Sequence, residues 1–260
     1  MKKGILIAGA ILLLAGVVIT VGALATVGFK VHKFSTIEME TNTYPVTGDF
    51  DSIEIEENTS DVVFRESEDG TCSVVCYEPK KTAHTVETAD GTLKIAAADQ
   101  RDWTGFMDLS FETRKMTVYL PKNEFADLTV HTKTGDVDIP EGLRFNNATI
   151  TGSTSDVRCG ASVSDKLSIR LSTGDITLSG VSAGAIDCTV TTGDIRFESV
   201  SCTGDVMLKV STGRTAIDEL TCRNLHSEGS TGKASFNNVV VTGTLAIERD
   251  TGDVDRKSVV

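Results

Sequence analysis

The sequence predicts an all-β fold, a single-stranded β-solenoid (β-helix) with 19–20-residue coils, preceded by one N-terminal transmembrane helix. Three observations support this prediction. A Thr-Gly-Asp centre recurs at a nearly constant interval, apolar and polar residues alternate on both sides of each centre, and lysines flank a long uncharged run at the N-terminus. We therefore expect a membrane anchor (1–33), a juxtamembrane linker (34–48) and a β-solenoid domain (49–260).

The spacing of the centres defines the coils. Measured at the central glycine or its substitute, the centres are 19 or 20 residues apart and stand at Gly135, Ser155, Gly174, Gly193, Gly213, Gly232 and Gly252. A period this short and regular is typical of a solenoid, in which each coil packs only on its neighbours. At about 4.8 Å between neighbouring strands, seven coils would make a rod roughly 30 Å long.

Apolar columns within the repeat predict the core. In the copy centred on Gly174 they are Leu167 and Ile169 before the centre, and Ile176 and Leu178 after it. A spacing of two residues is the period of a strand with one buried face. Each coil is therefore expected to contain a strand, the Thr-Gly-Asp turn, a second strand and a third short segment that closes the coil.

The Thr-Gly-Asp centre has two interpretations. In the first, glycine supplies the freedom to turn, and the threonine and aspartate side chains bind local backbone groups. In the second, stacked carboxylates form a ladder that holds calcium, with Asp136, Asp156, Asp175 and Asp194 as its members. The same column continues as Arg214, Lys233 and Asp253, and the nine-residue calcium-binding repeat is missing. Turn chemistry is therefore the favoured interpretation.

A further copy of the repeat lies upstream, at "SIEIEENTSDVVF" around Ser60, with apolar residues at the same offsets, namely Ile53, Ile55, Val62 and Phe64. Strand-like runs joined by polar turns separate it from the copy at Gly135. We expect an N-terminal cap or broad coil over 49–127 and regular coils over 128–260. Within the cap, Trp103, Phe106 and Met107 are expected to cover the open end of the solenoid, and the alternative is that they grip a partner or the membrane surface.

The N-terminal segment is expected to anchor the chain. An uncharged run from Gly4 to Phe29 has lysines on both sides, and its 26 residues would reach roughly 39 Å as a helix, against about 30 Å of hydrocarbon core. We expect a single pass through the cell membrane with the C-terminal domain extracellular. Signal-peptidase cleavage after Ala25 is the alternative.

The chain resembles a bacterial family called "putative adhesin", a domain of unknown function. The resemblance covers roughly residues 49–255 and rests on the lysine-flanked N-terminal segment, "FDSIEIEENTSDV", "DGTLKI", "VYLPKNEFADLTVHTKTGDV" and the succeeding "TGD" turns. It implies a membrane-anchored β-solenoid in the envelope of Gram-positive bacteria, without an established enzymatic activity. The predicted function is accordingly a surface module of the cell envelope with an adhesin, interaction or structural role.

Charge and motifs exclude other classes. Beyond the four lysines of the first 33 residues, 21 basic residues face 37 acidic ones, a formal charge of −16, so we expect no nucleic-acid partner. The four histidines, His32, His84, His131 and His226, lie far apart in the sequence, and no nucleophile elbow, metal-spaced cluster or phosphate loop is present. We predict no enzymatic activity, no catalytic residues, and no cofactor or metal site.

Two partner alternatives stay open. Parallel β-helices host polysaccharide lyases, so a secreted or surface carbohydrate-active protein is the second functional candidate, with Arg214 and Lys233 beside the aspartates as its basic residues. An envelope protein or polysaccharide is the expected partner of the favoured surface module, besides the membrane itself.

The cysteines give a test of the register. Cys159 and Cys188 fall in core columns and should be buried. Cys72 and Cys76, four residues apart in a strand, are about 13 Å from each other and cannot pair. Cys202 and Cys222 each follow their centre by nine residues, so they should stack in adjacent coils, about 5 Å apart and within reach of a disulfide.

The C-terminal coil is expected to be incomplete. Arg256 stands where earlier copies have an apolar core residue, and no capping sequence follows. A truncated or frameshifted family member would end this way. We therefore expect a poorly ordered last coil from about Thr251, an exposed Phe236, and self-association of the chain through this open end.

Overall fold

The computed structural model describes residues 2–26, 38–98 and 113–259. They separate into a unit that contains helix α1 (Lys2–Thr26) and a unit that contains the β-strands. Among the described residues, no helix combines the length and the apolar character that crossing a membrane requires. The transmembrane helix expected within residues 1–33 is therefore not confirmed.

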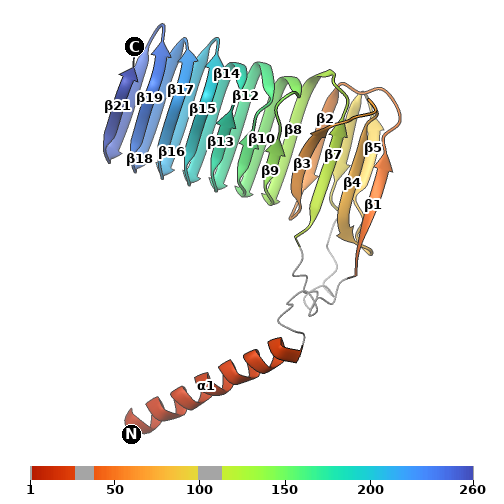
Figure 1. Cartoon of the computed structure of the whole chain (residues 1–260), viewed down its shortest axis with the longest axis vertical. Helices are drawn as coiled ribbons and strands as arrows, with labels where there is room; N and C mark the ends of the chain where they lie inside the picture. The colour runs from red at the N-terminus through yellow and green to blue at the C-terminus, as the bar shows by residue number, and fades with distance from the viewer. Residues whose placement is uncertain (1, 27–37, 99–112, 260) are drawn as a thin grey trace. The chain divides into compact units, whose positions relative to one another are not determined.

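The strands form two long rows along the solenoid (Figure 1). The first row contains, in spatial order, β5 (Thr85–Ala89), β6 (Thr92–Ala96), β2 (Ser52–Glu57), β8 (Glu124–Thr134), β10 (Arg144–Thr154), β12 (Ser162–Thr173), β14 (Ser182–Thr192), β16 (Asp205–Thr212), β18 (Asn224–Thr231) and β20 (Leu245–Thr251). From β6 to β20, neighbouring strands of this row are parallel.

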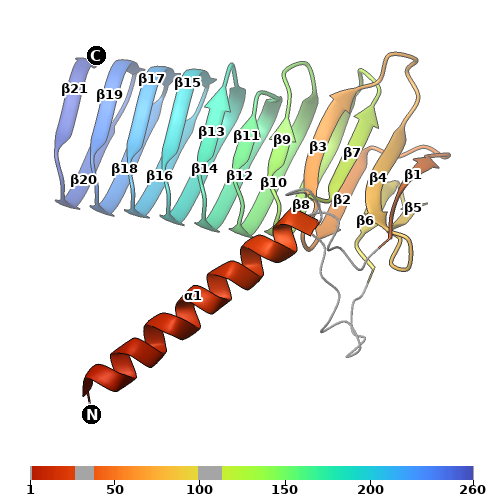
Figure 2. The same cartoon turned by 60° about the horizontal axis from the view of Figure 1, so that its bottom comes forward.

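The second row forms the other long side of the solenoid, with one strand from each coil (Figure 2). It contains β1 (Met39–Pro45), β4 (Ser73–Pro79), β7 (Lys115–Leu120), β3 (Asp61–Glu66), β9 (Val137–Ile139), β11 (Val157–Cys159), β13 (Ile176–Ser179), β15 (Ile195–Cys202), β17 (Thr215–Cys222), β19 (Ala234–Val241) and β21 (Val254–Val259). Parallel pairing runs from β7 to β21.

The pairing register confirms the predicted β-solenoid. The threonine before each centre pairs with the threonine of the next copy, from Thr134 with Thr154 through to Thr231 with Thr251. In the copy centred on Gly174, all four predicted core side chains are 0% exposed. The copy around Ser60 stacks directly on the first regular coil, because Ile53 pairs with Leu128.

A third side closes the coils, as the sequence predicts. Its inward residues stack from Phe125 and Phe145 through Val163 and Ala183 to Cys202. Cys222 continues this column, since the residues just before the two cysteines, Ser201 and Thr221, are paired across neighbouring coils. The predicted adjacency of Cys202 and Cys222 is thus confirmed, and both thiols are free. Cys159 and Cys188 are buried in the core, as expected.

The chain inserted between β3 and β8 extends the stack at its N-terminal end. Strand β6 pairs parallel with β2, and β7 pairs parallel with β3, so these two strands lie beyond the first coil. Beyond them the direction reverses: β5 is antiparallel to β6, and β4 is antiparallel to β7. The return of the chain through β4 and β5 positions the site described below.

The C-terminal end differs from the expectation. The last coil continues as β21, which pairs with β19, and Phe236 is only 1% exposed, so the exposed Phe236 was a wrong prediction, whereas the poor order of this coil stays a prediction. Phe236 is covered by the last coil itself, because β21 pairs with β19 and sets Arg256 beside Phe236. In the same coil the guanidinium of Arg249 donates hydrogen bonds to the hydroxyls of Thr215 (2.9 Å) and Ser227 (3.0 Å), two buried polar residues at core positions. The arginine closes the core from within the last coil, and burial lowers its pKa.

The turn explains the glycine of the repeat. A Cβ atom added to Gly174, Gly193, Gly213, Gly232 or Gly252 would lie 1.8 to 2.0 Å from the carbonyl oxygen of the preceding centre. The φ angles of these glycines, from 125° to 144°, are also strained for any residue with a side chain. Successive turns therefore stack backbone on backbone, and a side chain cannot fit between them.

We predict that Gly193→Ala lowers the free energy of unfolding by about 3–5 kcal/mol, because steric overlap with the carbonyl of Gly174 adds to the cost of a positive φ. The control is Gly70→Ala, at a positive φ of 73° with no atom within 4 Å of the added Cβ, where a loss of about 1–2 kcal/mol is expected. Urea unfolding of residues 38–260 measures both. Equal losses would contradict the close-contact explanation.

Candidate functional site

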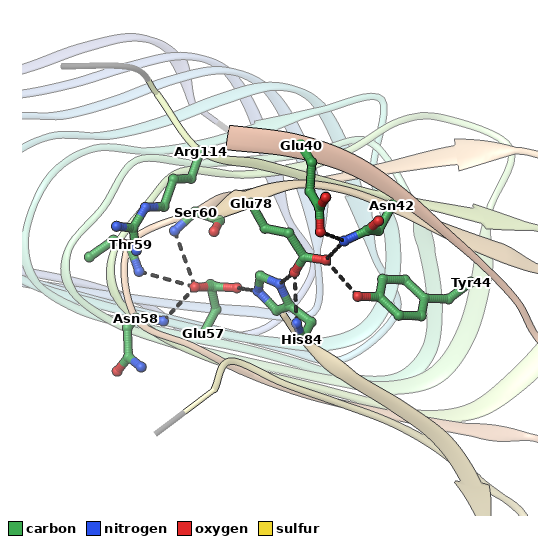
Figure 3. Close-up of polar contacts among 10 residues, drawn as sticks. All are labelled: Glu40, Asn42, Tyr44, Glu57, Asn58, Thr59, Ser60, Glu78, His84 and Arg114. Atoms are coloured by element: carbon green, nitrogen blue, oxygen red, sulfur yellow. Dashed lines mark hydrogen bonds and ion pairs between the residues drawn. The ribbon is translucent and has the colours of Figure 1, made fainter. Parts of the chain in front are cut away.

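A cluster of polar side chains is buried at the N-terminal end of the solenoid (Figure 3). Glu57 is the last residue of β2, Glu78 lies in β4, and His84 lies in the turn before β5. The three residues are 4%, 0% and 8% exposed. We call them the Glu57–His84–Glu78 cluster.

Glu57 links the first turn of the solenoid to the cluster. One carboxylate oxygen, Oε1, accepts hydrogen bonds from the backbone N–H groups of Asn58 (2.7 Å), Thr59 (3.1 Å) and Ser60 (3.2 Å). The other oxygen contacts His84 Nε2 at 2.7 Å. Burial alone would raise the pKa of Glu57, but the hydrogen bonds with His84 and the backbone lower it below its ordinary value.

Glu78 is held by strand β1 and by His84. Its Oε1 accepts hydrogen bonds from Tyr44 Oη (2.5 Å) and Asn42 Nδ2 (2.7 Å). Its Oε2 accepts the backbone N–H of His84 at 2.7 Å and also contacts the ring nitrogen Nδ1. Burial opposes ionisation of Glu78, but these donors lower its pKa, whereas burial and the neighbouring carboxylate raise the pKa of Tyr44.

His84 lies between the two carboxylates. Because each ring nitrogen faces a carboxylate oxygen, both nitrogens act as donors and the ring is an imidazolium ion. Burial alone would lower the pKa of His84, but its contacts with Cys76, Glu57 and Glu78 raise it to about 11. The metal-free cluster therefore carries two carboxylates and one imidazolium, and its ionised groups are hydrogen-bonded, as buried charges must be.

Cys76 lies beside the Glu57–His84–Glu78 cluster. It lies in β4 two residues before Glu78, on the same face of the strand, and is 0% exposed. Burial raises the pKa of its thiol. Its Sγ, a Glu78 carboxylate oxygen and a His84 ring nitrogen lie within 4.8 Å of one another, the one such grouping of potential metal ligands within the described ranges.

The aspartates of the repeat also form a ladder, as predicted, but its hydrogen bonds pass from coil to coil. The Oδ1 atoms of Asp136, Asp156 and Asp175 accept the backbone N–H of the next aspartate at 2.8 to 2.9 Å. Asp194 likewise accepts the N–H of Arg214 at 2.8 Å. The aspartate column is thus part of the solenoid's own backbone hydrogen bonding, as the turn interpretation predicts, but its bonds join neighbouring coils instead of the local backbone groups that were expected.

Arginines occupy the other carboxylate oxygens of the ladder. Arg196 lies 2.7 Å from Asp175 Oδ2 and 2.6 Å from Asp194 Oδ2, and Arg158 lies within 4 Å of both Asp136 and Asp156. Arg214 adds a contact of 3.4 Å to Asp194. The compensating cations therefore come mainly from strands β11 and β15, and the calcium interpretation has no support from this arrangement.

Among the residues that the structure describes, the histidines other than His84 belong to no grouping of potential metal ligands. His131 contacts the hydroxyl of Thr151, and His32 lies outside the described residues. The same holds for Trp103, Phe106 and Met107, so both interpretations of that segment stay predictions. Cys72 and Cys76 are free, as expected for two residues that cannot pair.

The cluster was not predicted, because its residues are far apart along the chain. Two signals for it are present in the sequence. The alternation of Ile53, Ile55 and Glu57 places a carboxylate at an inward position at the end of a strand, and Cys76 and Glu78 alternate in the same way. Neither signal predicts that the chain returns to bring His84 between them.

The shifted pKa values predict a stability maximum between about pH 4.5 and 6.5 for the metal-free protein. His84 has a raised pKa in the folded state, so its contribution is full below about pH 6.5 and is lost as the pH rises toward 11. The two glutamates have lowered pKa values, so their contribution is lost below about pH 4.5.

We therefore predict that the wild type has a larger free energy of unfolding than His84→Gln at pH 5 to 6.5. Above pH 6.5 this difference should shrink by up to about 1.4 kcal/mol per pH unit. Denaturant unfolding from pH 5 to 9, with a chelator present, measures it. His226→Gln, outside the cluster, should keep the wild-type profile. A constant difference between wild type and His84→Gln would refute the imidazolium assignment.

Solved structures of other proteins share the fold of this chain. A "putative adhesin" from Bacteroides fragilis has a similar solved structure, with 16% identity and a TM-score of 0.53 over 85% of this chain and 97% of that one. A "putative lipid binding protein" from Parabacteroides distasonis has 16% identity and a TM-score of 0.52 over 87% and 95% of the two chains. At this identity both share the fold alone.

No curated protein matches the chain. The family model described as Toastrack DUF4097 matches residues 50–257, which is most of the sequence and nearly all of the β-solenoid. The resemblance to the "putative adhesin" family of unknown function is thereby confirmed. The chain belongs to the Toastrack DUF4097 family.

Proposed function

We propose that the chain is a non-catalytic interaction module of a bacterial cell envelope, displayed outside the cell membrane. The observation that carries this proposal is that the repeated aspartates of the Thr-Gly-Asp turns bind other parts of the same solenoid. The carboxylates of the turn bind the next coil and neighbouring arginines, so the most regular feature of the molecule serves its own assembly. A rigid, extended β-solenoid of this kind is a scaffold for contacts along its length.

The charge of the solenoid narrows the class of partner. Residues 34–260 carry a formal charge of −16, which repels nucleic acid and anionic lipid headgroups. An envelope protein or polysaccharide, bound through cationic groups or neutral contacts, is compatible with this surface. The similarity to the "putative adhesin" fits this role, whereas the lipid binding for which the Parabacteroides distasonis protein is named fits an acidic surface less well if the lipid is anionic.

The membrane anchor is the part of the proposal that rests on the sequence. The run from Gly4 to Phe29 contains no charged residue, and lysines flank it on both sides. Helix α1 covers most of this run. We infer a single-pass anchor with the solenoid extracellular, and cleavage after Ala25 is the alternative.

Display at the surface is tested by fractionation of a bacterial host that expresses the full chain with a C-terminal epitope. The tagged chain should sediment with membranes, resist extraction by salt, and be degraded when intact cells are treated with protease. Removal of residues 1–33 should release the chain from the membrane fraction. A tagged product in the medium that begins at Thr26 would show that the segment is cleaved.

Binding is tested with residues 38–260, which retain β1 because Asn42 and Tyr44 contact Glu78. Immobilised, this domain should retain an envelope protein or polysaccharide from host extracts, and an equally acidic unrelated domain should not. Uronate polymers incubated with the same domain should yield no unsaturated products. Turnover of such a polymer would instead favour the carbohydrate-active alternative, with Arg214 and Lys233 as the residues to substitute.

Self-association through the C-terminal end is the remaining partner proposal. Strands β20 and β21 each pair on one side only in the described part of the solenoid, and Val254 is 37% exposed. Arg249 opposes such pairing, because an inward-pointing charge disfavours the addition of another strand edge.

We therefore predict weak self-association of wild-type residues 38–260 in sedimentation experiments and at least severalfold tighter association for Arg249→Leu, which removes the charge from the end of the core. Arg223→Leu, an exposed arginine paired with Asp205 two coils from the end, serves as the control and should behave as wild type. Unchanged sedimentation of Arg249→Leu at high concentration would show that the end is not an association surface.

A further inference from the structure

We propose that Cys76, Glu78 and His84 bind a zinc-like divalent transition-metal ion, with Glu57 as the residue that orients the histidine. The potential ligand atoms, a thiol sulfur, a carboxylate oxygen and an imidazole nitrogen, lie within 4.8 Å of one another. All three residues are buried. A mixed sulfur, nitrogen and oxygen set is typical of zinc and related ions, whereas calcium and magnesium prefer oxygen ligands alone.

The second contact of each ligand fits a metal site. His84 Nε2 lies 2.7 Å from Glu57 Oε2, which leaves Nδ1 facing Glu78 as the coordinating nitrogen. A carboxylate that accepts the other ring N–H is the usual support of a metal-bound histidine. Glu57 is itself fixed by three backbone N–H groups, and Glu78 by Asn42 and Tyr44. Both carboxylates are therefore oriented before a metal binds.

The charge of the cluster is the same with and without the ion. In the metal-free state Glu57 and Glu78 each carry one negative charge, His84 carries one positive charge, and Cys76 is a neutral thiol, which gives a total of −1. A divalent ion would replace the proton on His84 Nδ1 and the proton on Cys76 Sγ, and the total would again be −1. Two protons leave to solvent for each ion bound, and no oxidation or reduction is involved.

The geometry requires one small rearrangement. His84 Nδ1 and Glu78 Oε2 are in direct hydrogen-bond contact, but two ligands on one tetrahedral zinc ion lie about 3.3 Å apart, given bond lengths of about 2.0–2.1 Å. His84 lies in the turn between β4 and β5, so its backbone can follow this change more easily than a strand residue can. Three protein ligands leave the fourth position for a water molecule.

The location of Cys76 distinguishes it from the other thiols. Cys159, Cys188, Cys202 and Cys222 fill inward columns of the solenoid core, where a small apolar residue suffices. Cys76 instead lies beside two ionised carboxylates and an imidazolium. Burying these charged groups costs stability, and metal binding by the Cys76 thiolate would explain why they are present.

Cobalt(II) titration of the purified, metal-stripped full chain tests the proposal. One equivalent should produce a sulfur-to-cobalt charge-transfer band and intense visible bands typical of a tetrahedral site, and zinc should abolish both. About two protons per ion should be released into a weakly buffered solution at neutral pH. Cys76→Ser should lose the charge-transfer band, and Cys72→Ser, four residues earlier in the chain, should keep it.

The variant Glu57→Gln tests whether Glu57 orients His84 or itself coordinates the ion. It should keep the charge-transfer band and weaken metal affinity by about 10–100-fold, as expected for a residue that supports a ligand. Far-ultraviolet circular dichroism of each variant establishes that it is folded. The measurement on the wild type decides the question even if a variant does not fold, because the absence of a sulfur-to-cobalt band at stoichiometric cobalt would overturn the proposal. Retention of the band in folded Cys76→Ser would overturn it as well.

Discussion

The close approach of the carbonyl oxygen of one turn to the glycine of the next turn sets the spacing of the coils from Gly174 to Gly252. From Gly174 to Gly252, an added Cβ would lie within 2.0 Å of that oxygen, so nothing can separate the coils at this edge. Both rows of strands must then pair at the spacing and register that the turn imposes. A slip of one residue would turn every apolar side chain outward, so the apolar columns and the glycine turn enforce the same arrangement.

The rest of the turn follows from this stacking. Once the backbones are this close, Oδ1 of the aspartate after the glycine reaches the N–H of the next copy. Its second oxygen can then meet an arginine, as Asp175 and Asp194 both do with Arg196 of β15. The repeated motif is therefore explained by contacts of the chain with itself. Residues that bind a partner should be sought where the coils differ, such as the outward strand positions and the cap at the N-terminal end.

The regular coils could be predicted from the sequence because their two signals are local. The period of two within a strand and the interval of 19 or 20 residues between centres can both be counted without a structure, and they place Cys202 beside Cys222 correctly. The Glu57–His84–Glu78 cluster could not be predicted, because its members come from three segments that meet only after the chain reverses through β4 and β5. Arg249 escaped prediction for another reason: arginine usually faces solvent, and its inward orientation depends on the buried hydroxyls of Thr215 and Ser227.

The two ends of the solenoid meet the same physical requirement in different ways. A stack of coils must cover its last layer of core residues, and apolar side chains do so without burying charge. At the C-terminal end Phe236 is 1% exposed beneath β21, and Arg249 binds the buried hydroxyls of Thr215 and Ser227. At the N-terminal end the chain instead buries two carboxylates, an imidazolium and a thiol, although an apolar cluster of similar volume would cover the core as well and is often more stable. Stability alone therefore does not account for the composition of this cap, and the chemistry of Cys76, Glu78 and His84 is the better guide to what the N-terminal end of the solenoid does.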